Sequence, residues 1–177
     1  MSVPAVIQGI YDSGVADWMR HSLKAMPFVE AAHVLAIAVV FGSILIVDLR
    51  LLGVPNARRP ITVVSHEMLR LTWGAFIVAV ITGALMFAPN AITYFGNTAF
   101  RLKMLTLLAA GINMLVFQFF TYRSVASWDL APRSPGAARA AAVLSIVLWI
   151  AVIFLGRWIG FTKGYDFAVP EDIQFDF

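Results

Sequence analysis

The chain has 177 residues, of which 60% are hydrophobic and only 13% are charged, and its mean hydropathy is +0.83. This composition leaves too little polar surface for a soluble globular protein and indicates a single membrane domain. The formal charge of +3 is dispersed, which argues against a nucleic-acid partner, and the absence of cysteine excludes disulfides, iron–sulfur clusters, thiolate metal sites and covalently attached haem.

The N-terminal segment, residues 1–26, does not have the form of a secretory signal, because two aspartates interrupt it and no basic start precedes an apolar run. Its apolar residues, among them Ile7, Ile10 and Trp18, recur at helical spacing. We therefore expect an interfacial helix here. Two glycines weaken that helix, so a partly ordered leader is the alternative.

Four apolar stretches follow, each long enough to cross the hydrocarbon core of a bilayer as a helix. We place them at residues 28–47, 71–87, 104–120 and 140–155, separated by connections rich in glycine, proline and charge. The predicted fold is all-α, an integral membrane four-helix bundle at residues 27–160 followed by a C-terminal tail at residues 161–177. An even number of spans places both termini on one side.

Basic residues give a weak signal for orientation, because seven lie in the loops after the first and third spans and six lie on the opposite side. The first group is clustered in short loops, which favours the cytoplasmic side. We therefore expect a multi-pass protein of the bacterial inner membrane with both termini in the periplasm. His33 then lies near the outer face and His66 near the cytoplasmic face.

Asp48 and Arg50 leave the first span two residues apart, flanked by leucines. Charged side chains at a helix end commonly pair or reach toward the headgroups. An Asp/Arg pair that anchors the following loop is the favoured interpretation, ahead of a role in a functional site.

His33 is the first candidate functional residue, because an ionisable group inside a membrane span is costly and marks function by default. Arg101 and Lys103 open the third span from the same side, so the three side chains can converge on one pocket if the first and third spans are neighbours. Asn113 lies near the middle of the third span, and Arg157 lies near the outer end of the fourth.

Two interpretations of His33 fit the sequence equally well: a hydrogen bond to Glu30 one turn earlier, and axial ligation of a haem. His21 and His66 are further candidate ligands. Each of these two is more simply a solvated histidine at headgroup depth.

The first three spans resemble two groups of small helical membrane proteins, the HemJ-type protoporphyrinogen oxidases and the copper-resistance-D membrane domains. The resemblance rests on His33 early in the first span, a glycine later in it, Arg50 at its end, and KMLTLL at residues 103–108. It implies haem b bound through His33, with Lys103 matching the lysine that heads the third span. The chain departs from the pattern at Asn113, where a histidine is expected, and this argues against porphyrinogen oxidation. Residues 30–53 also resemble an uncharacterised family of bacterial inner-membrane proteins.

The resulting prediction is a haem b-binding membrane protein that takes part in electron transfer and has a redox partner, with a role in an oxidoreductase left open. His33 supplies the axial ligand, small residues supply an apolar slot, and Arg101, Lys103 or Arg157 supplies a cation for the propionates.

Copper handling and a non-catalytic subunit role in a larger membrane complex are the alternatives. Thioether and imidazole groups suit Cu(I), and several lie on the predicted outer side. They are Met19, Met26, Met86, Met104, His21 and His33. Residues 164–177 offer aromatic anchors between acids, which would suit a subunit that binds a larger complex.

Overall fold

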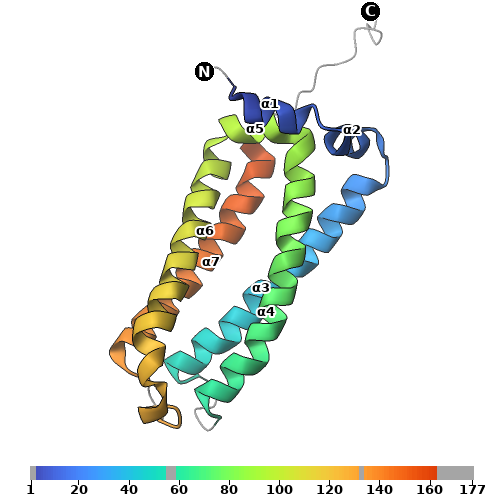
Figure 1. Cartoon of the computed structure of the whole chain (residues 1–177). Helices are drawn as coiled ribbons and strands as arrows, with labels where there is room; N and C mark the ends of the chain where they lie inside the picture. The colour runs from blue at the N-terminus through green and yellow to red at the C-terminus, as the bar shows by residue number, and fades with distance from the viewer. Residues whose placement is uncertain (1–2, 55–58, 132–133, 163–177) are drawn as a thin grey trace, which may run out of the picture.

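The computed structural model describes residues 3–54, 59–131 and 134–162, and these residues form helices without any strand (Figure 1). Four segments are long and apolar enough to cross a membrane, which confirms the predicted all-α membrane bundle. They are α3 (Ala25–Leu52), α4 (Ile61–Phe87) with the short helices η1 (Ala88–Asn90) and α5 (Ala91–Gly96), α6 (Thr98–Val116) with the turns that follow it, and α7 (Gly136–Thr162).

The helices extend beyond the predicted apolar spans. α4 begins at Ile61 and not near residue 71, because a helix keeps its backbone hydrogen bonds while polar side chains face water outside the hydrocarbon. α6 ends at Val116, and a π-helical turn, η2 (Phe117–Thr121), and a 3-10 stretch, η3 (Tyr122–Ser127), continue the third segment. Hydropathy thus marked the apolar depth of each helix and not its ends.

One end of the bundle, here named the capped end, is covered by α1 (Ala5–Tyr11) and α2 (Gly14–His21), next to α5 (Figure 1). The predicted interfacial helix is therefore two short helices, and Ser13 starts the second by accepting a hydrogen bond from the Ala16 N–H at 3.3 Å. Met19 is buried against the bundle, whereas Trp18 is 59% exposed. The C-terminal end of α7 lies at this same end, and residues 163–177, most of the predicted tail, fall outside the described residues.

The order in which the helices pack decides which side chains meet. α3 packs along α4 and meets α7 at the end of the bundle away from α1 and α2, and α6 packs along α7 (Figure 1). α7 therefore lies between α3 and α6, so the first and third membrane segments are not direct neighbours.

Arg50 organises the opposite end, here named the loop end. Its side chain is 4% exposed, and it donates hydrogen bonds from Nε to the carbonyl of Arg59 at 2.7 Å and from Nη2 to the carbonyl of Asp129 at 3.2 Å. Arg50 thus anchors two loops, through backbone carbonyls. α3 ends two residues later at Leu52, and the φ of 87° at Gly53 lets the N–H of Val54 reach the carbonyl of Leu49.

Asp48 faces α7, where it interacts with the hydroxyl of Ser145. The Asp48 side chain is 6% exposed, and its Oδ2 atom has no hydrogen-bond partner among the described residues. Of the two residues that were predicted to anchor the following loop, Arg50 makes the loop contacts and Asp48 contacts α7.

Asp129 caps the start of α4 from a distant loop. Its Oδ1 accepts a hydrogen bond from the N–H of Thr62 at 2.9 Å, and its Oδ2 accepts one from the Thr62 hydroxyl at 2.7 Å. Desolvation opposes the charged form, but the bonds from Thr62 and Ile61 and the charge of Arg50 outweigh it and hold the pKa of Asp129 below its usual value. The carboxylate therefore satisfies α4 N–H groups that would otherwise lack partners.

We expect Asp129→Ala to lower the free energy of unfolding by about 1 kcal/mol at neutral pH, because it removes this cap. Since the pKa of Asp129 is lowered by folding, the stabilisation is full above about pH 4, the ordinary pKa of the carboxyl, and is lost as the pH falls through its lower folded value. Unfolding in mixed detergent micelles between neutral and acid pH measures this. The exposed Asp12, at the capped end, provides the control Asp12→Ala, and a gap between Asp129→Ala and wild type that does not shrink in acid contradicts the charge argument.

Candidate functional site

His33 lies on α3 in the half of the bundle near the capped end, and its half-buried imidazole faces α4. Nδ1 is 2.8 Å from the hydroxyl oxygen of Thr82. A Cβ atom built on the next residue, Gly83, would lie 3.1 Å from Cε1 of the imidazole, closer than an ordinary van der Waals contact. The absence of a side chain at Gly83 therefore gives the ring its room against α4.

The hydrogen bonds of Thr82 favour the tautomer of His33 that carries its proton on Nδ1. A threonine hydroxyl has one proton to donate, and that of Thr82 points back into its own helix, 2.7 Å from the carbonyl of Val78 and 3.3 Å from that of Ala79. The Thr82 oxygen is then the acceptor for His33, so Nδ1 is the donor. In the neutral ring, Nε2 therefore carries the free lone pair, which is the form that binds a metal.

The hydrogen bond to Thr82 replaces the predicted bond between His33 and Glu30, which lies on the same helix. Thr82 and Gly83 were not predicted as partners of His33. The signal for them is weak, because a threonine and a glycine inside an apolar span most often serve helix packing.

Lys103 lies on α6, and its half-buried side chain rests on Gly156 of α7, with Nζ 3.6 Å from the position that a Cβ would take. The charge of Lys103 is close enough to act on His33. Arg101 is exposed, so the predicted convergence of three side chains is reduced to His33 and Lys103. Arg101 and Lys103 are two residues apart on α6, about 200° around the helix axis, so the two side chains leave opposite faces of that helix.

The other predicted site residues have different surroundings. Arg157 and His66 are exposed, and His66 lies in the loop-end half of α4. Asn113 is half-buried and donates a hydrogen bond from Nδ2 to the carbonyl of Ala141 on α7 at 3.0 Å, so it joins two helices. His21 is exposed, and its Nδ1 lies 2.9 Å from the carbonyl of Asp17.

The described residues contain no group of three or more histidine and acidic side chains that could together hold a metal ion. Among the methionines of the copper alternative, Met19 is 2% exposed and packs inside the cap, whereas Met104 is 40% exposed. These two thioethers therefore have the surroundings of core and surface residues respectively.

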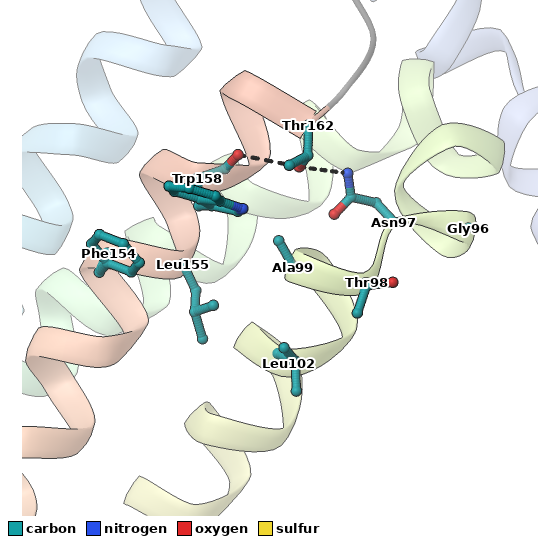
Figure 2. A pocket seen from close by; sticks show the side chains of 9 residues that line it. All are labelled: Gly96, Asn97, Thr98, Ala99, Leu102, Phe154, Leu155, Trp158 and Thr162. Carbon is teal, nitrogen blue, oxygen red and sulfur yellow. Dashed lines mark hydrogen bonds between the residues drawn. The ribbon is translucent and has the colours of Figure 1, made fainter.

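A separate pocket of about 440 Å³ lies at the capped end, between the start of α6 and the end of α7 (Figure 2). Asn97 donates a hydrogen bond from Nδ2 to the hydroxyl of Thr162 at 3.0 Å, and so ties the two helices together above the pocket. Leu102, Phe154 and Trp158 contribute to its apolar walls. None of the predicted site residues lines this pocket.

Comparison with known proteins gives one match. No curated protein and no solved structure matches the chain, so the resemblance to HemJ-type oxidases and copper-resistance-D domains stays a prediction. A family model does match, and the matched residues include α3, α4, α6 and α7 together with His33 and its partners. The chain belongs to the family of unknown function DUF6644, whose model covers residues 22–162.

Proposed function

We propose that this membrane protein binds haem b through Nε2 of His33 and takes part in electron transfer with a redox partner. The observation that supports the proposal is the bond from Nδ1 of His33 to Thr82, because a haem-ligating imidazole needs a free Nε2 lone pair and a fixed Nδ1 proton.

The residues around His33 fit a haem in three respects. Thr82 sets the tautomer, Gly83 leaves space for the ring, and Lys103 brings a cation of the kind that pairs with a propionate. His21 and His66 are exposed, so His33 is the best-placed histidine ligand among the described residues. Bound haem supplies reversible one-electron chemistry.

The absorption spectrum of the purified protein tests the proposal. Protein produced in cells supplied with a haem precursor and purified in mild detergent is expected to show a Soret band, and a sharp α band after reduction with dithionite. Metal analysis of the same sample separates the alternatives, since iron near one equivalent supports haem. Copper without these bands would favour copper handling, and a colourless, metal-free protein would overturn the proposal.

We also propose that the capped end faces the periplasm of a bacterial inner membrane. This orientation rests on the clustering of arginines in the loops at the other end. Because the chain has no cysteine, single cysteines at exposed positions report the side directly. A membrane-impermeant maleimide is expected to label Val15→Cys in intact spheroplasts and Ser127→Cys only after lysis. The reverse pattern would invert the orientation.

A further inference from the structure

A groove of about 480 Å³ lies at the loop end, between the last residue of α3 and the first turns of α7. Leu52 contributes from α3, and Val143 and Val147, one turn apart on α7, contribute apolar walls. Val143 is 51% exposed and Val147 is 57% exposed, so these walls lie on the outside of the bundle. In a membrane, the groove is therefore open to lipid.

Arg139 lines the groove at the end nearest the start of α7, and it is the only charged residue in the lining. Within the part of the chain that the structure describes, its guanidinium has no hydrogen-bond or ion-pair partner. Gly136, also in the lining, is the first residue of the 27-residue helix α7, whose first N–H groups lack partners within the helix and carry its positive dipole. A cation and a helix N-terminus thus lie together at one end of an apolar groove.

We infer that this groove binds an anionic phospholipid, with the phosphate at Arg139 and an acyl chain along Val143 and Val147. The positive charge of Arg139 favours an anionic lipid, because basic side chains at the edge of the hydrocarbon attract acidic headgroups. The apolar walls favour an acyl chain, because they continue from Arg139 into the hydrocarbon depth. The pocket at the capped end offers a comparison within the same protein, since no charged residue lines it.

Native mass spectrometry with equal amounts of phosphatidylglycerol and phosphatidylcholine tests the inference. Wild type is expected to retain phosphatidylglycerol preferentially. Arg139→Gln is expected to reduce that preference about fivefold, the effect of one basic residue at a membrane surface. Arg123→Gln is the matched control, because Arg123 is exposed in η3 at the same end but does not line the groove.

Two further measurements distinguish lipid binding in the groove from simple attraction of an anion to Arg139. Ala140→Trp places a large side chain in the groove lining and is expected to reduce retention of phosphatidylglycerol while Arg139 stays in place. Glycerol phosphate, which has the headgroup chemistry without acyl chains, is expected not to displace the bound lipid. Equal retention of both lipids by wild type, an equal loss in Arg123→Gln, or displacement by glycerol phosphate would each overturn the inference.

Discussion

His33→Ala is expected to reduce the haem content of the purified protein to background while the helix content stays unchanged. The substitution removes the proposed axial ligand, and no other histidine among the described residues is similarly half-buried. The pyridine haemochromogen assay measures haem content, and circular dichroism reports the fold. His21→Ala and His66→Ala are the matched controls and should retain haem, because both residues are exposed. A His33→Ala protein that keeps the reduced α band would rule out His33 as the ligand.

Two neighbouring positions separate ligation from simple helix packing. Thr82→Val removes the acceptor for Nδ1 and is expected to weaken haem binding by about 10- to 100-fold, the usual effect of losing such a supporting hydrogen bond. Thr82→Ser, which keeps the hydroxyl, should retain most of the haem affinity. Gly83→Ala should also weaken binding, since the new Cβ would lie 3.1 Å from the ring, whereas Gly74→Ala on the same helix meets nothing within 4 Å. Similar losses at Gly74 and Gly83 would point to a general effect on α4.

Arg50→Met is expected to lower the free energy of unfolding by about 3 kcal/mol, the largest loss of stability we predict. The substitution keeps most of the buried side-chain volume but removes the hydrogen bonds to the carbonyls of Arg59 and Asp129 and leaves these groups without their donor. It also removes a positive charge that favours the carboxylate of Asp129. The cap on α4 should weaken together with the loop contacts.

Unfolding by SDS in mixed micelles measures this loss. Arg50→Lys should fall between wild type and Arg50→Met, because an ammonium keeps the charge but not the two-sided geometry of the guanidinium. Arg70→Met, at an exposed position of α4, is the control and should change the free energy of unfolding by less than about 0.5 kcal/mol. A loss of that small size in Arg50→Met would show that the loops are held by other contacts.

The sequence was sufficient to predict the four membrane helices, because apolar runs of this length have few other structures available. It also marks His33 as a candidate functional residue, since an ionisable residue within such a run is unusual. The partner of His33 was not predictable in the same way. Choosing Thr82 over Glu30 requires the rotation of α4 about its axis, which nearly uniform apolar composition does not reveal.

The predicted convergence of Arg101, Lys103 and His33 assumed that the first and third segments are neighbours. Chain order made that arrangement plausible, but α7 packs between α3 and α6, and Arg101 is exposed. The contact of Asp129 with Thr62 was equally hidden, because 67 residues separate the two in sequence. Contacts within one helix follow from spacing, whereas contacts between helices depend on an arrangement that only the whole bundle determines.

The central place of α7 has a consequence for biosynthesis. As the ribosome delivers the chain, α3 and α4 can pair at once as a hairpin, but α6 has no extensive partner until α7 follows it into the membrane. The helix that joins the two halves is thus translated after both of them. A truncation that removes it should leave an inserted α3/α4 hairpin and a solitary third span, the kind of intermediate that membrane quality-control proteases recognise.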